Sequence, residues 1–124
     1  MKSQIAALAQ QHFGAEMHSK RLPASFFDTA NSVEALAFAT KDALFVIDDY
    51  APKTPQNATR FQETADRLFR GLANQSGRSR LRSNLTIRAA RPPRALMFGT
   101  GEDIPSGESL RARMLTDDAR RHQE

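Results

Sequence analysis

Two short apolar runs restrict the possible folds more than any other feature of this sequence. Residues 43–47 (Ala-Leu-Phe-Val-Ile) end in the acidic pair Asp48 and Asp49, and residues 95–98 (Ala-Leu-Met-Phe) are followed by Gly-Thr-Gly-Glu. Continuous rather than alternating apolarity is typical of strands buried on both faces, as in a parallel sheet. The sequence therefore predicts two buried strands, each with polar residues at its carboxyl end.

Helical patterns separate these runs. The first apolar stripe has the i, i+3, i+4, i+7, i+8 spacing of one helix face, and it consists of Ile5, Leu8, Ala9, His12 and Phe13. Asn31 and Glu34 have the spacing of a capping box, which predicts a second helix over 32–40. A short stretch at 20–24 could be a strand, and Pro23 would restrict it to an edge or an end.

A third helix begins at a clear start signal, Thr54 followed by Pro55. Its apolar face then comprises Phe61, Ala65, Leu68, Phe69 and Leu72. Residues 77–93 have the composition of an exposed loop or hairpin, and a last helix is predicted to include 109–115. Helices that alternate with buried strands predict a three-layer α/β domain, here over 1–115 with a polar tail at 116–124.

The basic residues are unevenly distributed. Eight of the 18 basic residues are arginines between 67 and 101, where no acidic residue occurs. The other 89 residues therefore hold all 14 acidic residues against ten basic ones. A basic block on an otherwise mildly acidic domain indicates an anionic partner such as nucleic acid. The alternative reading is a solvated loop that is merely rich in arginine.

Composition excludes several classes of protein. The chain has no Cys, which excludes a disulfide framework, a Cys nucleophile and a thiolate zinc site. No apolar run approaches the roughly 20 residues of a membrane-spanning helix, and the first residues lack the order of a secretory signal. We therefore expect a cytoplasmic protein without a membrane partner.

The acidic pair after the first apolar run suggests a magnesium–nucleotide site. In open α/β folds the chemistry lies at the carboxyl ends of the strands, and paired carboxylates there can hold a metal and orient a water. Lys2 and Ser3 open the first predicted helix about 45 residues before Asp48. A phosphate loop of the form GxxxxGK[ST] also ends in Lys-Ser/Thr and runs into a helix.

Read together, these segments resemble a known family. The chain looks like the P-loop ATPase core in the C-terminal parts of bacterial, phage and plasmid primase–helicase-type proteins. The resemblance covers about residues 2–115, and its most specific segments are Gly-Thr-Gly-Glu-Asp-Ile-Pro at 99–105 and Ser-Leu-Arg-Ala-Arg-Met at 109–114. It implies an incomplete P-loop NTPase core of the RecA/AAA+ type, with ATP and Mg²⁺ as ligands and a DNA replication setting.

The resemblance implies a role for particular residues at the nucleotide. Lys2 would bind the β- and γ-phosphates, and Ser3 would bind Mg²⁺. Asp48 and Asp49 match the Walker B carboxylates, with Asp48 at the metal. Thr100 matches the polar sensor near the γ-phosphate.

Two further implications concern partners. Arg111 and Arg113 occupy the place of an arginine finger that acts on a neighbouring subunit, which implies a homo-oligomer or ring. The family often places a DNA-contacting hairpin between the Walker B and sensor strands, and the matching residues here are Arg78, Arg80, Arg82 and Arg88.

The chain also departs from the family. The glycine loop and the strand before it are absent, so the sequence reads as truncated inside the Walker A motif. We therefore expect impaired ATP and Mg²⁺ binding, an unpaired edge on strand 95–98, and little catalysis by this chain alone, which leaves its status as an enzyme open. The alternative function is a non-enzymatic module that binds nucleic acid, or caps a ring, through the Arg-rich segment 67–94.

Overall fold

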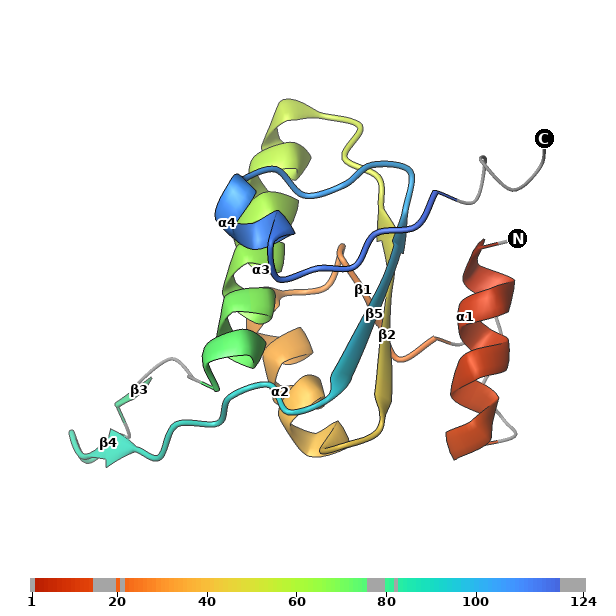
Figure 1. Ribbon diagram of the computed structural model, residues 1–124. Coiled ribbons are helices and arrows are strands. Elements are labelled where there is room, and N and C mark those ends of the chain that lie inside the picture. The colour runs from red at the N-terminus through yellow and green to blue at the C-terminus, as the bar shows by residue number, and fades with distance from the viewer. Residues whose placement is uncertain (1, 15–19, 21, 76–79, 82, 119–124) are drawn as a thin grey trace.

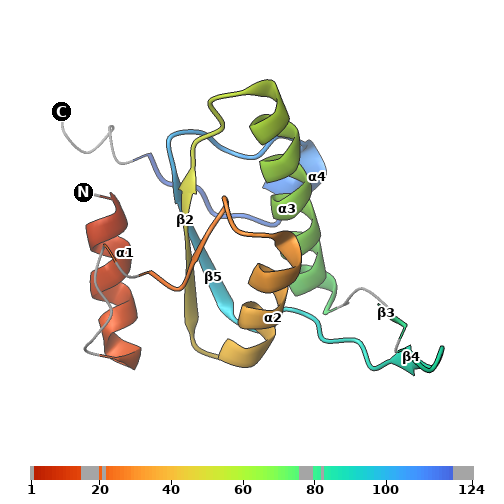
Figure 2. The same cartoon turned by 180° about the vertical axis from the view of Figure 1, so that it is seen from behind.

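The computed structural model describes residues 2–14, 20, 22–75, 80–81 and 83–118. Its centre is a parallel three-stranded sheet in the order β1-β2-β5, formed by β1 (Ala24–Ser25), β2 (Leu44–Tyr50) and β5 (Leu96–Gly101). Helix α1 (Lys2–Gln10) covers one face, and α2 (Ala30–Thr40) and α3 (Pro55–Asn74) cover the other (Figures 1 and 2). The predicted three-layer α/β architecture is confirmed.

Both crossover helices start at threonine caps. The Thr54 hydroxyl accepts a hydrogen bond from Asn57 N at 3.2 Å, and Pro55 occupies the first turn of α3, as predicted. Helix α2 is capped by Thr29, whose hydroxyl accepts from Ser32 N at 3.3 Å. The capping box predicted for Asn31 and Glu34 is therefore wrong, because the helix begins earlier and the Glu34 side chain turns inward.

The core lies between the sheet and the α2/α3 layer. Strand β2 is buried on both faces over Phe45–Ile47, as its continuous apolar run predicted. The same prediction is wrong for β5, because this strand lies at the edge of the sheet and leaves Leu96 and Phe98 exposed. Helix α3 contributes one buried stripe from the predicted apolar face, and Leu110 of α4 (Glu108–Arg111) closes the end of the core. The largest fully buried side chains are Phe26, Phe45, Phe61, Ile47, Leu68, Leu110, Val33, Val46 and Pro93.

Helix α1 packs on the sheet through a different face from the predicted one. Its buried residues are Ala6, Ala7 and Gln10, whereas Ile5 and Leu8 are 52% and 63% exposed. The short alanine side chains let the helix approach the sheet closely, and Gln10 Nε2 donates to Leu44 O at 3.4 Å. Polar anchoring to the sheet thus determines the orientation of α1, and its most apolar stripe points away.

The last helix is shorter than predicted, because α4 ends at Arg111 and turns follow it. The predicted strand at 20–24 appears only as the edge pair Ala24–Ser25. Between α3 and β5, β3 (Arg80–Leu81) and β4 (Ile87–Arg88) form the predicted hairpin, which projects from the body (Figure 1). No helix in the described part of the chain combines the length and apolarity that crossing a bilayer requires.

Candidate functional site

The carboxylate of Asp48 is the centre of a polar cluster at the carboxyl end of the sheet. Ser3 Oγ donates a hydrogen bond to Asp48 Oδ1 at 2.8 Å, and Thr100 Oγ1 donates to the same oxygen. Lys2 Nζ donates to the backbone oxygen of Gly101, at the end of β5. Four side chains from three distant parts of the sequence therefore meet at one place.

The parallel pairing of β2 and β5 explains why these side chains lie together. Strands β2 and β5 are neighbours and run in the same direction, with Val46 opposite Phe98 and Ile47 opposite Gly99. Their carboxyl ends therefore coincide, and Asp48 lies beside Thr100. Helix α1 runs antiparallel to both strands, because Gln10 contacts Leu44 near one end and Ser3 contacts Asp48 near the other. Its N-terminus consequently lies at the same end of the sheet.

A β-bulge separates the roles of the two aspartates. The register between β2 and β5 shifts between Ile47 and Tyr50, so β2 holds one more residue than β5 over this stretch. Asp49 has φ 67°, in the left-handed region, and its carbonyl accepts from Ala51 N at 2.8 Å. Bulges and left-handed non-glycine residues concentrate at functional sites. Asp48 stays half-buried on the α1 side, while the bulge presents Asp49 to solvent.

The donor set around Asp48 fits a hard divalent cation. Hydroxyl and carboxylate oxygens are the protein ligands of Mg²⁺, which usually takes one or two carboxylates and keeps several waters. Ser3 and Asp48 supply such oxygens 2.8 Å apart. The described residues contain no group of three or more His, Asp or Glu side chains arranged to hold a metal. A cation here would accordingly depend on phosphate and water oxygens for its remaining ligands.

The loop after β5 is tied to β2 and α3. Tyr50 O accepts from the backbone N–H groups of Glu102 and Asp103 at 3.0 and 3.3 Å. Gln62 of α3 forms a two-way pair with Ser106, because Nε2 donates to Ser106 O and Oε1 accepts from Ser106 N, both at 2.8 Å. The Tyr50 hydroxyl also contacts Gln62 Oε1 at 3.3 Å. Sequence reasoning did not identify Gln62, since an isolated polar residue on an amphipathic helix carries no local signal.

Burial gives Tyr50 an unusual titration. Removal from water, and secondarily the negative charge of Asp103, raises the pKa of the Tyr50 phenol above its ordinary value of 10.0. The hydroxyl therefore remains protonated under all ordinary conditions. Its role at this end of the sheet is to pack and to hydrogen-bond.

Arg111 and Arg113 lie apart from the Asp48 cluster. Arg111 Nε donates to Pro105 O at 3.3 Å, and Arg113 Nη1 donates to Ser109 O at 2.5 Å and to Ser109 Oγ at 2.8 Å. Helix α4 contacts α3, on the opposite side of the sheet from α1 (Figure 1). Within one chain, both arginines bind acceptors close to them in sequence.

The middle of the Arg-rich segment forms the β3–β4 hairpin. Arg80 lies directly opposite Arg88 in its antiparallel register, and Leu81 lies opposite Ile87. Leu85, near the hairpin turn, is 81% exposed with φ 62°. Arg78 and Arg82, the other two predicted nucleic-acid contacts, lie outside the described residues. Nearer β5, Arg94 stacks over the ring of Phe38 at 4.6 Å.

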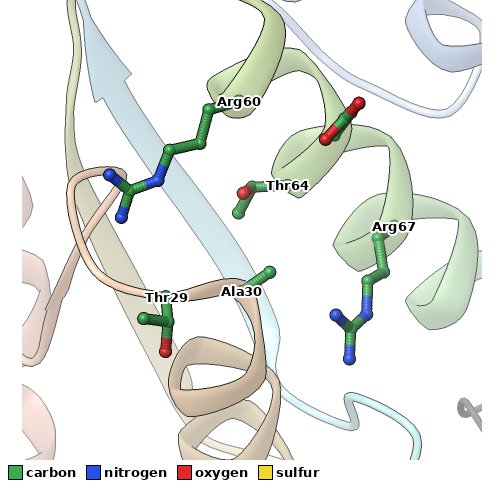
Figure 3. Close-up of a pocket in the computed structure, with 6 residues that line it drawn as sticks. Thr29, Ala30, Arg60, Thr64 and Arg67 are labelled. Carbon is green, nitrogen blue, oxygen red and sulfur yellow. The ribbon is translucent and has the colours of Figure 1, made fainter. Parts of the chain in front are cut away.

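A pocket of about 450 Å³ lies elsewhere, between α3 and the start of α2 (Figure 3). Arg60 and Arg67 reach from α3 toward Thr29 and Ala30, with Thr64 between them. Arg60 Nη2 donates to Phe27 O at 2.6 Å, and Arg67 forms an ion pair with Glu34 at 2.5 Å. Arg67 connects α3 to α2, and Arg60 connects α3 to the loop before α2, so we assign the pocket a structural role.

Comparison of the chain with known protein families, with curated proteins and with solved structures gives no match. The geometry around Asp48 is thus the basis on which function can be argued.

Proposed function

We propose that this chain is the nucleotide-handling core of a P-loop-type ATPase of the primase–helicase kind, acting in the cytoplasm on nucleic acid. The observation that supports the proposal is the shared acceptor Asp48 Oδ1, which binds the Ser3 hydroxyl at a helix N-terminus and the Thr100 hydroxyl at the next strand end. A helix N-terminus, an acidic strand end and a neighbouring polar strand end are three of the parts from which a Mg²⁺–triphosphate site is built.

In this proposal each side chain has one task. Ser3 Oγ and the Asp48 carboxylate hold Mg²⁺, and Lys2 releases Gly101 O to bind phosphate oxygens. Asp49, exposed by the bulge, orients the attacking water. Thr100 moves its hydroxyl between Asp48 and the γ-phosphate and so senses the nucleotide. Bound Mg²⁺ supplies charge neutralisation at the phosphates.

Affinity for ATP is low in this proposal. A phosphate loop cradles the phosphates with successive backbone N–H groups of a glycine-rich turn. The 124 residues contain no GxxxxGK sequence. In this proposal the 124 residues supply the metal-binding and sensor residues without the backbone cradle, and their hydrolysis of ATP is very slow.

Titration with a fluorescent ATP analogue, with and without Mg²⁺, tests the proposal. Binding is expected to be weak and Mg²⁺-dependent, and Asp48→Asn and Ser3→Ala should each abolish the Mg²⁺ dependence. Asp42→Asn, in the exposed turn before β2, and Gln4→Ala, beside Ser3 on the exposed side of α1, are the matched controls. Binding that Asp48→Asn and Lys2→Ala leave unchanged would refute the site.

A second function, nucleic-acid binding without catalysis, is favoured by one feature of the hairpin. Arg80 and Arg88 are cross-strand neighbours, and like charges directly opposite each other destabilise a strand pair. Arginine pairs well with phosphate, which would offset this repulsion. We propose that the hairpin binds the backbone of DNA.

Salt-dependent binding to single-stranded DNA tests this second function. Three to five phosphate contacts on a single strand should give a log–log slope of about −2 to −3.5. Replacement of Arg78, Arg80, Arg82 and Arg88 by Ala should flatten the slope, whereas replacement of Arg60 and Arg70 on α3 should not. An unchanged slope in the fourfold variant would show that the basic segment is only a solvated loop.

A further inference from the structure

Strand β5 has a long edge that the described residues leave unpaired. It pairs with β2 on one side only, whereas the opposite edge of the sheet is the two-residue β1. Its sequence, Leu-Met-Phe-Gly-Thr-Gly, contains no charged residue and no proline. Sheets normally protect exposed edges with charges, prolines or very short strands. The edge of β5 has none of these three protections, and the segment that follows α4 crosses it only near the carboxyl end of the strand in the view of Figure 1.

Apolar side chains continue from this edge onto α1. Leu96 and Phe98 are 69% and 41% exposed, and they point to the α1 side because Met97 packs against the core on the other side. Lys2 reaches Gly101, so its flank of α1 faces the edge of β5. Ile5 and Ala9 follow Lys2 at i+3 and i+7 and share that flank. We call Ile5, Ala9, Phe13, Leu96 and Phe98 the β5–α1 patch.

We propose that the β5–α1 patch binds the same patch on a second copy of this chain, with the two β5 strands antiparallel about a twofold axis at Met97. Leu96 N donates to Ala43 O, toward β2. The backbone groups of alternate residues 95, 97 and 99 therefore point outward, as an antiparallel ladder centred on Met97 requires. In this register Leu96 lies opposite the partner's Phe98, and Phe98 lies opposite the partner's Leu96. Each exposed apolar side chain therefore contacts another.

This register leaves the Asp48 cluster intact. It uses residues 95–99, whereas Thr100 and Gly101, which contact Asp48 and Lys2, lie outside it. The inference therefore stands independently of the proposed nucleotide site. It adds an interaction surface at the edge of the sheet.

The position of α1 is compatible with a twofold axis at Met97. Ser3 contacts Asp48 and Gln10 contacts Leu44, so the part of the helix around Ala9 lies level with Phe45 and hence with Met97. Helix α1 contacts both β2 and β5. If α1 lies midway between β2 and β5 and neighbouring strands are about 4.8 Å apart, two α1 helices above a β5–β5 pair would lie about 10 Å apart. That is the packing distance of helices, and Ala9 provides a small side chain at the crossing.

The surface is large enough for a specific dimer. Ile5, Phe13, Leu96 and Phe98 are 52%, 59%, 69% and 41% exposed, which leaves on the order of 450 Å² of side chain accessible on each copy, since a large side chain has roughly 150–250 Å². Two such patches and the strand backbones reach about 1,000 Å², the lower limit for a specific interface.

Sedimentation of the full chain over a range of concentrations tests the dimer. We expect a concentration-dependent monomer–dimer equilibrium, and Leu96→Lys should weaken dimerisation at least tenfold because it adds two charges to the interface. Leu85→Lys, at the comparably exposed hairpin position, is the control and should change nothing. A monomer at all concentrations, or a dimer that Leu96→Lys leaves intact, would overturn the proposal.

Cross-linking tests the register, since the chain has no native Cys to interfere. A size-tagged Leu96→Cys protein mixed with Phe98→Cys protein should form the mixed disulfide under mild oxidation much faster than either protein links to itself. Leu85→Cys gives the background rate for an exposed thiol. Mixed linkage no faster than this background would exclude the antiparallel pairing centred on Met97.

Discussion

Gly101 lies so close to Tyr50 that no side chain fits between them. A Cβ on Gly101 would be 2.5 Å from Tyr50 O and 2.6 Å from Tyr50 Cβ. This contact occurs where the β2 bulge ends, so Gly101 allows the two strands to pair again after the extra residue. The glycine is therefore a structural requirement of the site that contains Asp48.

Replacement of Gly101 by Ala should destabilise the chain by about 1–3 kcal/mol, because the clash involves backbone atoms that cannot rotate away. The matched control is Gly99→Ala, two residues earlier in the same strand, where the new Cβ would lie 4.0 Å from Phe26 Cε2, an ordinary contact. Urea unfolding of both variants measures the difference. Equal stability of the two variants would contradict the close approach.

The backbone of Asp49 supports a second prediction. Its φ of 67° lies in the left-handed region, which costs a residue with a side chain roughly 1 kcal/mol and glycine almost nothing. Asp49→Gly should therefore raise the unfolding free energy by about 0.5–1 kcal/mol, although it removes an exposed carboxylate. Asp49→Val should lower it, because a β-branched side chain fits this region poorly. A loss of stability in Asp49→Gly would show that the carboxylate itself stabilises the bulge.

The raised pKa of Tyr50 predicts a loss of stability in alkali. The unfolded phenol loses its proton near its ordinary pKa of 10.0, whereas burial and the charge of Asp103 keep the folded phenol protonated to higher pH. Above pH 10 the folded state therefore binds more protons than the unfolded state. The stability that the protonated Tyr50 phenol contributes is complete below pH 10 and is lost as the pH rises through the pKa of the folded state. Unfolding free energies between pH 8 and 11 should decrease for the natural chain and stay flatter for Tyr50→Phe. Parallel curves would exclude Tyr50 as the titrating group.

The sequence predicts the parts of this fold that depend on local pattern. The apolar run before Asp48 and the Thr54-Pro55 start were sufficient to predict β2 and α3. Parallel order then implied that Asp48 and Thr100 would lie together, and they share a hydrogen bond. These features were predictable because periodicity, capping and strand direction act over short distances.

Long-range contacts determine the features that the sequence did not predict. Periodicity alone favoured Ile5 and Leu8 as the buried face of α1, but the hydrogen bonds of Ser3 and Gln10 to β2 rotate the helix so that alanines face the sheet. The bulge at Asp49 depends on the register between two strands about 50 residues apart, which no local pattern records. Such features require knowledge of which segments become neighbours.

The ion pair between Glu34 and Arg67 supports the last prediction. The two side chains are 2.5 Å apart and only 9% and 24% exposed, and they connect α2 to α3 beside the pocket of Figure 3. Arg67 Nη2 also donates to Asn31 Oδ1 at 2.9 Å. Removing one charge from a mostly buried pair leaves the other without compensation, which costs several kcal/mol at full burial. Because Arg67 retains some contact with water, we expect Glu34→Gln to cost about 1–3 kcal/mol.

The comparison for this pair is Asp66 with Arg70, an i, i+4 pair on α3 whose side chains are 43% and 42% exposed. An exposed pair of this kind contributes about 0.5 kcal/mol or less, so Asp66→Asn should change stability little. Urea is the appropriate denaturant, because guanidinium salts screen the charges that the experiment compares. If Glu34→Gln and Asp66→Asn lower the unfolding free energy equally, then burial does not strengthen the Glu34–Arg67 pair, and apolar packing must hold α2 against α3.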